Sequence, residues 1–358
     1  MAEDLACGGP GGPPRLNFSS ILSLGEVGIR FLSNRSTELD PTRTVSLIDQ
    51  LVTPAAITYY PKQSVKKFNN GNMTAMRAAP PVLLLSHGTT LLTGEDSHIR
   101  DYWLYHGNKA VEYGIKGIII MGAHWNVPGR KIKVAMNPDP KAQPIALVSR
   151  SKYGHYKPNA DLKTGARCME MLKAAGFEVE ADLKCNWLID TFPMIFRMFP
   201  GKCPPVTIIS QNSYFEPHFH IEIGRVLRPL RKEGYLFMGS GGGVHNLYRT
   251  EWRNIIKWRD NFAQELPPEP THLEFRQALE DVICKNGGGP AMKQGVVRLM
   301  KHPYYRDAHG TDDHYMPTCF IAGVVGEEED RKDKGVLGAE LWELRNQAET
   351  QFAFGEWP

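Results

Sequence analysis

The chain has 358 residues, of which 42% are hydrophobic and 23% charged, and its formal net charge is +3. This length allows one large α/β domain or two smaller ones, and the composition is ordinary for a globular protein. So small a charge argues against a nucleic-acid partner, and no apolar run is long enough to cross a bilayer, so we expect no membrane partner.

The start of the chain is acidic and then rich in glycine and proline, unlike a targeting peptide. We predict a disordered tail over residues 1–16, an N-terminal extension of uncertain structure over 17–79, and a folded domain over 80–358. The six cysteines are dispersed and form no CxxC pair. This favours reduced thiols in a cytoplasmic protein rather than a disulfide framework.

Short apolar runs alternate with longer amphipathic segments from residue 80 onward, which predicts an α/β domain with a central, largely parallel or mixed sheet flanked by helices. We expect the last third to be mostly helical, and the charged run at 327–335 to be a solvated surface loop. Strands are predicted at 81–88, 114–125, 131–136, 204–210 and 235–240, and helices at 97–114, 160–176 and 217–232.

Three histidines follow predicted buried strands directly: His87, His124 and His245. Strand–helix–strand units connect with a fixed hand, so these strand ends meet at one edge of the sheet, where ligands bind in such folds. Imidazole suits Zn, Fe, Cu and Ni, so the pattern indicates a metal site. The alternative is that each histidine only caps or packs after its strand.

Two further stretches are rich in glycine or in metal-binding side chains. The run "GSGGG" at 239–243 lacks the spacing of a nucleotide-binding loop, and it favours a place where the backbone approaches another group closely. The stretch "DAHGTDDHYMP" at 307–317 contains His309, Asp313 and His314. It is either part of the metal site or a polar loop before a helix that starts near Tyr315.

The ordered set "SHG" (86–88), "GAHW" (122–125), "SGGGVHNL" (240–247) and "HGTDDHYMP" (309–317) resembles the class III extradiol ring-cleavage dioxygenases. The resemblance covers about residues 80–325. It is strongest to the DOPA 4,5-dioxygenase branch, which is related to the catalytic LigB subunit. It implies a single catalytic domain over 80–358 and a mononuclear Fe(II) or Zn(II) site with histidine ligands. It also implies a small aromatic, catechol-like substrate and dioxygen as partners.

The resemblance also assigns roles to individual histidines. His87 and His124 match the best-attested ligand positions, and His314 matches the histidine of a family motif in which Asp313 stands for a glutamate. His245 matches a histidine that serves as base or ligand. We therefore expect the metal ligands among His87, His124, His245 and His314, and we take His245 and His309 as the candidate catalytic residues.

One departure from the family concerns a mid-chain histidine. In "NWLIDTFPMIF" (186–196), Ile189 occupies the position of that histidine, so one polar group of the pocket would be absent. Ile189 and Asp190 are predicted to contact substrate. The alternative is a packed helix start with Asp190 as its N-cap.

The other departure is "SKYGHYKP" (151–158). There, Tyr153, His155 and Tyr156 are predicted to line the substrate pocket, and His155 would supply the lost acid–base capacity. A surface loop is the alternative interpretation of this segment.

These residues predict a metal-dependent dioxygenase that opens or otherwise oxidises a catechol-like ring. The alternative is a non-oxidative Zn-dependent lyase, hydrolase or cyclase on the same scaffold, which the replacement at Ile189 favours. A non-catalytic binding protein is a third possibility, and the retained histidines argue against it. The sequence gives no indication of oligomeric state.

Overall fold

The computed structural model of the protein describes residues 78–358, apart from residues 95, 259 and 263–265. The predictions for the tail at 1–16 and for nearly all of the extension at 17–79 lie outside this part. None of the helices in the described part combines the length and the apolar character needed to cross a lipid bilayer.

The described part is built on a nine-stranded sheet in the order β4-β3-β5-β2-β6-β1-β9-β7, with β8 paired to β9. Neighbours β1–β6, β6–β2, β2–β5 and β3–β4 run parallel, whereas β3–β5 and all pairs of β9 run antiparallel. The predicted α/β fold with a largely parallel or mixed sheet is thus confirmed. The strands are β1 (Val82–Ser86), β2 (Gly117–Val127), β3 (Ile132–Ala135), β4 (Val179–Asp182), β5 (Val206–Asn212), β6 (Tyr235–Gly241), β7 (Val244–His245), β8 (Gly335–Glu343) and β9 (Gln347–Phe354).

The helices predicted at 97–114 and 160–176 are present, but the one predicted at 217–232 is interrupted at Arg228, directly before Pro229, which cannot continue the preceding helix. The Ser97 side chain accepts a hydrogen bond from the Arg100 N–H and so caps the start of one helix, while Gly114 ends it at φ 70°. The helices are α1 (Thr90–Gly94), α2 (His98–Tyr113), α3 (Leu162–Ala174), α4 (Phe192–Met198), α5 (Pro217–Leu227), α6 (Pro229–Lys232), α7 (Trp252–Trp258), α8 (Pro270–Asn286), α9 (Pro290–Leu299), α10 (Tyr305–Ala308) and α11 (Met316–Val324).

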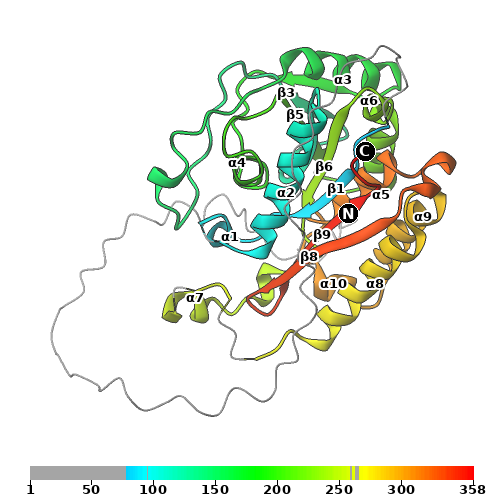
Figure 1. The fold of residues 1–358 in the computed structure, drawn as a ribbon. Helices are drawn as coiled ribbons and strands as arrows, with labels where there is room; N and C mark the ends of the chain where they lie inside the picture. Colours follow the sequence, from blue (N-terminus) through cyan, green and yellow to red (C-terminus); the bar gives the residue numbers. More distant parts are fainter. Residues whose placement is uncertain (1–77, 95, 259, 263–265) are drawn as a thin grey trace, which may run out of the picture. The chain divides into compact units, whose positions relative to one another are not determined.

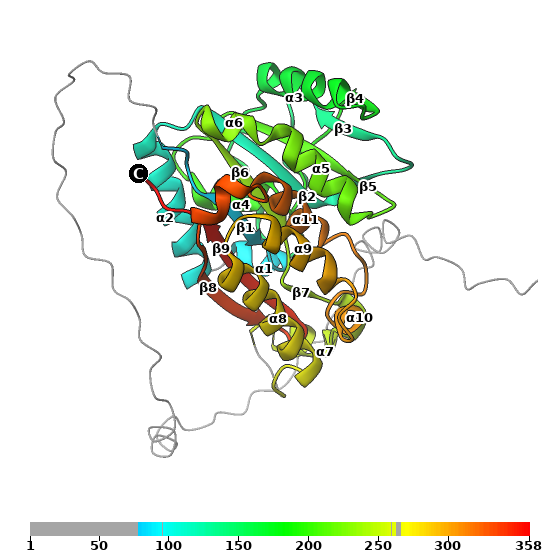
Figure 2. The same cartoon turned by 90° about the vertical axis from the view of Figure 1, so that its right-hand side faces the viewer.

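Helices cover both faces of the sheet (Figures 1 and 2). On one face α3, α5, α8, α9 and α11 pack against side chains such as Leu84, Ile119 and Phe237. On the other face α1, α2 and α4 pack against side chains such as Leu83, Ile118 and Ile120. Alternate residues of each central strand therefore enter two separate cores, which explains why these strands read as continuous apolar runs.

The last third of the chain corrects the sequence analysis in two places. It is not mostly helical, because the described chain ends in the antiparallel hairpin β8–β9, and β9 lies inside the sheet beside β1. The charged run at 327–335 is not a purely solvated loop. Asp330 is only 3% exposed and forms ion pairs with Arg228 and Arg231, which compensate its charge.

Candidate metal centre

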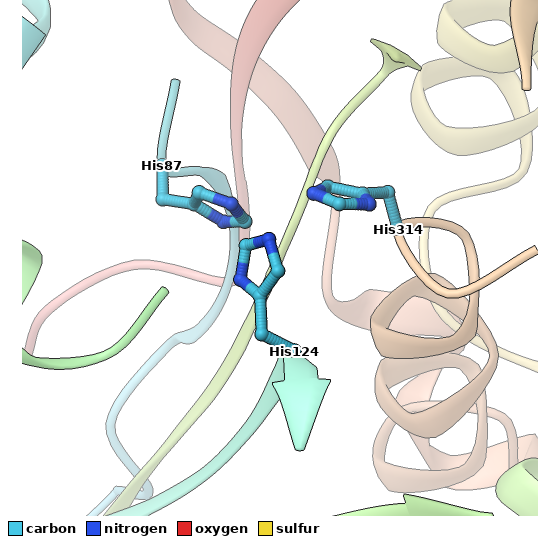
Figure 3. Close-up of side chains that lie close together, drawn as sticks. All are labelled: His87, His124 and His314. Atoms are coloured by element: carbon cyan, nitrogen blue, oxygen red, sulfur yellow. The ribbon is translucent and has the colours of Figure 1, made fainter. Parts of the chain in front are cut away.

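Three histidines from distant parts of the sequence converge at the carboxyl ends of the parallel strands (Figure 3). His87 directly follows β1, His124 lies near the end of β2, and His314 precedes α11. One nitrogen atom from each ring lies within 4.8 Å of the other two. Because β1 and β2 both pair in parallel with β6, their carboxyl ends share one edge of the sheet, as the sequence predicted.

The glycine run at the end of β6 is what allows the His314 segment to approach. A Cβ atom on Gly241 would lie 2.2 Å from the carbonyl oxygen of His314, so only glycine fits there. The Gly242 N–H donates to that same carbonyl at 3.2 Å, and the His87 N–H donates to the Gly241 carbonyl at 3.2 Å. The run therefore serves close backbone approach, and it joins the segments that carry two of the three histidines.

Side chains behind the rings orient His87 and His124. Ser240 donates its hydroxyl proton to the Asp190 carbonyl, so it must accept a hydrogen bond from Nδ1 of His87, which lies 3.1 Å away. Nδ1 of His87 therefore carries the proton, and Nε2 of that ring has the free lone pair. Asp190 Oδ2 accepts the backbone N–H of His124 at 2.7 Å and lies 3.6 Å from Nδ1 of its ring. Such partners fix ring orientation and tautomer in metal sites.

His314 is held in a similar way. Asp313 Oδ1 lies 3.1 Å from Nδ1 of His314 and accepts the His314 backbone N–H at 3.0 Å. Gln211, at the end of β5, donates from Nε2 to the Gly122 carbonyl at 2.7 Å and to the Asp313 carbonyl at 2.8 Å. One buried amide thus ties the strand that carries His124 to the segment that carries His314.

The protonation and the hydrogen bonding of these imidazoles are suited to binding a divalent metal ion. Burial lowers the pKa of His87 well below its ordinary value, and the nearby His124 and His314 rings lower it further. Nε2 of His314 is buried and has no hydrogen-bond partner within the described residues. Three clustered imidazoles, one held neutral and one with an orphaned nitrogen, form a donor set that suits Zn(II) or Fe(II).

The two candidate catalytic histidines lie in different environments. His245 stacks on His314, with the ring centroids 3.5 Å apart, but it lies outside the group of three. Burial and then the His314 ring lower the pKa of His245 well below its ordinary value. His309 is fully buried, and its ring packs against Phe275 and Tyr315. Both ring nitrogens of His309 are buried without a hydrogen-bond partner among the described residues, and its catalytic role stays a prediction.

The predicted substrate residues are spread over a wider region. Tyr153 and Tyr156 are buried and pack on Phe192, the first residue of α4, whereas His155 is exposed. Ile189 is half-buried.

Asp190 was the alternative N-cap, and that interpretation is wrong. Thr191 occupies the cap position of α4, while the Asp190 side chain is 1% exposed and turned to His124. Asp190 is therefore a positioning residue behind His124.

Ser240 and Gln211 were not predicted from the sequence as residues that support the site. Their partners lie 50 to 153 residues away along the chain, so no local pattern marks them. The glycine run around Ser240 was a partial signal, because it marked the place of close approach.

Comparison with known proteins agrees with this geometry. The family described as the catalytic LigB subunit of aromatic ring-opening dioxygenase matches residues 81–355. A 4,5-DOPA dioxygenase extradiol of Escherichia coli K12 is 26% identical over 252 residues, which are 70% of this chain and 86% of that protein. A protein of the same name from Portulaca grandiflora is 26% identical over 261 residues, 72% of this chain and 90% of that one.

A solved structure shares the fold. The crystal structure of an uncharacterized Escherichia coli K12 protein superposes with a TM-score of 0.60 at 21% identity, covering 77% of this chain and all of that one. The family match and the two named relatives confirm the resemblance found in the sequence and support an enzyme of dioxygenase type. The chain belongs to the family of the catalytic LigB subunit of aromatic ring-opening dioxygenases.

Proposed function

We propose that the protein is a metal-dependent extradiol-type dioxygenase that acts on a catechol-like aromatic substrate with dioxygen. The convergence of His87, His124 and His314 is the observation that carries the proposal. The relatives named 4,5-DOPA dioxygenase extradiol support it, since each matches most of its own length.

His87, His124 and His314 would hold the metal, with Ser240, Asp190 and Asp313 behind them. A bound Fe(II) ion would supply Lewis-acid and redox chemistry for activating a phenol and dioxygen. His245 stacks on His314 and is half-buried, so it is the residue of this chain best placed to take a phenolic proton. A positioned general base contributes about 10²–10⁴-fold in rate.

The donor set also favours a second candidate function. Non-haem Fe(II) oxygenases typically use two histidines and one carboxylate, whereas three histidines with an open position are typical of catalytic zinc. Among residues 78–358 as far as the structure describes them, the clustered group consists of three histidines and no carboxylate. A non-oxidative Zn(II) lyase, hydrolase or cyclase on this scaffold is therefore the alternative.

The test compares Fe(II)-loaded and Zn(II)-loaded full-length protein, prepared anaerobically, with DOPA and with simple catechols. Oxygen uptake that matches catechol loss, with a coloured ring-opened product, is expected only for the Fe(II) form. His314→Ala should abolish it, while His218→Ala, which changes an exposed histidine on α5, should not. Turnover by the Zn(II) form without oxygen uptake would overturn the dioxygenase proposal in favour of the second candidate.

A further inference from the structure

A second buried polar group, which we call the hairpin acid cluster, consists of Glu343, Gln347 and Glu349 on the C-terminal hairpin and Asn261 from the segment between α7 and α8. Glu343 pairs with Gln347 across β8–β9, and Glu349 follows two residues later on the same face of β9. All four residues are at most 1% exposed. Two carboxyl groups thus lie in the interior, within hydrogen-bonding reach of each other.

The hydrogen bonds within this cluster do not satisfy it. Glu343 accepts from the N–H and hydroxyl of Thr89, at 2.6 and 2.7 Å, and from the Asn261 amide. In the described part of the chain, neither oxygen of Glu349 accepts a well-aligned hydrogen bond, although the Glu343 carboxyl and the Gly88 N–H interact with it. Among the described residues, the Gln347 side-chain amide has no partner at either end, and the side-chain Oδ1 of Asn261 has none.

The charge of the cluster is also uncompensated. Within the described residues, the groups that act on Glu343 and Glu349 include no lysine, arginine or histidine. Glu340, on the same strand as Glu343, shows the contrast, because Arg276 pairs with it. Buried charges and buried amides normally have partners, so their absence here points to a missing positive group.

We propose that the hairpin acid cluster binds a divalent cation that prefers oxygen ligands, and that Ca²⁺ fits it best. Carboxylate and amide carbonyl oxygens are the ligands that such cations take, and two carboxylates match a charge of +2. Mg²⁺ usually keeps several waters, whereas these side chains lie in the dry interior, which favours Ca²⁺.

The place of the cluster gives the ion a role. Gly88 and Thr89 directly follow His87, and a Cβ on Gly88 would lie 2.5 Å from Glu343 Oε2. Gln347 pairs with His245 across β7–β9. A cation held here braces the segments that carry both histidines, but it is distinct from a metal bound by imidazoles and does not depend on the proposed function.

The test uses the full-length protein, stripped of metal with a chelator and titrated with CaCl₂ by calorimetry and by thermal unfolding. We expect one saturable Ca²⁺ per chain, at a dissociation constant of about 10⁻⁵–10⁻³ M, and a higher Tm. Glu349→Gln keeps the side-chain shape and removes one charge, so it should weaken Ca²⁺ binding at least about tenfold. If that variant does not fold, Gln347→Met serves the same purpose.

Two control variants separate this site from others. Glu340→Gln, which alters a carboxylate already paired with Arg276, and His314→Ala, which alters the three-histidine centre, should both keep the Ca²⁺ response. A wild type without a saturable Ca²⁺ response would overturn the proposal and leave a shared proton as the occupant. An undiminished response in Glu349→Gln, or in Gln347→Met where that variant is the one that folds, would overturn it as well.

Discussion

The three-histidine centre and the hairpin acid cluster are both buried and polar, yet they are built in different ways. An oxygen atom lies behind each ring of the centre: Ser240 hydrogen-bonds His87, and the carboxylates of Asp190 and Asp313 lie 3.6 and 3.1 Å from Nδ1 of His124 and His314. Glu349 and Gln347 have no such support. Burial drives an imidazole such as that of His87 toward its neutral form, whereas a pair of buried carboxyl groups needs a proton or a cation. Buried carboxyl oxygens without hydrogen-bond partners therefore indicate a bound ion or proton, just as clustered histidines indicate a bound metal.

The largest effect is expected at the three-histidine centre. His87→Ala, His124→Ala and His314→Ala should each abolish stoichiometric binding of Zn(II) or Fe(II), because two imidazoles alone leave the ion weakly held. Metal content of the purified variants by elemental analysis is the measurement. His218→Ala, at the exposed start of α5, is the matched control and should keep its metal. Full metal content in any of the three variants would show that the site is misplaced.

The next largest effect is expected in the hairpin acid cluster, where the stability of the folded protein should change with pH in a direction set by Glu349. Burial raises the pKa of Glu349 well above its ordinary value, and the Glu343 carboxylate raises it further. The folded state therefore holds the proton more tightly than the unfolded state. Its contribution to stability is present below about pH 4.3 and is lost as pH rises through the folded pKa.

Urea unfolding of chelator-treated protein at several pH values measures this effect. As pH rises, the free energy of unfolding of the wild type should fall relative to that of Glu349→Gln, because the glutamine cannot ionise. Each pKa unit of difference is worth about 1.4 kcal/mol. Glu274→Gln, at an exposed position on α8, is the control. Stability differences that do not change with pH would mean that Glu349 is not perturbed.

A smaller effect is expected from the side chain that links two histidine segments. Gln211→Leu removes the amide that bridges the Gly122 and Asp313 carbonyls, so the spacing of His124 and His314 is no longer fixed. Loss of such outer partners typically weakens metal binding about 10–100-fold. Competition with a chromophoric chelator measures the affinity. Gln294→Leu, an exposed position on α9, should leave it unchanged.

The same contrast explains what the sequence could predict. Residues Ile118–Ile120 are buried on both faces of the sheet, so the sequence of β2 is a continuous apolar run that predicts a buried strand. The expected topology of strand–helix–strand units then placed the histidines at the ends of such strands on one edge of the sheet. The convergence of His87 and His124 was therefore predictable. Their supporting contacts were not, because Ser240 and Gln211 act across long stretches of chain.

The hairpin was missed for a different physical reason. In β9, Gln347, Glu349 and Gln351 alternate with less polar residues, a pattern that normally places the polar side chains in water. Here the whole strand is buried between β1 and β8, and Gln351 accepts from Trp103 at 2.8 Å and donates to the Ser86 carbonyl at 2.9 Å. Whether a polar residue of a strand is buried depends on tertiary contacts, and the alternation of polar and apolar residues along that strand does not reveal those contacts.

The smallest effect is expected at Ile189, the position at which the family usually has a histidine. Ile189 is half-buried beside Asp190, whereas the acid–base candidate His245 stacks directly on His314. An imidazole helps catalysis only within hydrogen-bond reach of the transferred proton, so Ile189→His should change kcat with a catechol by less than about tenfold. Steady-state oxygen uptake measures it, with Leu183→His, an exposed position in the segment before α4, as control. A gain of 10²–10⁴-fold in Ile189→His alone would show instead that the missing imidazole limits the wild type, and would place the reacting proton beside Ile189 rather than His245.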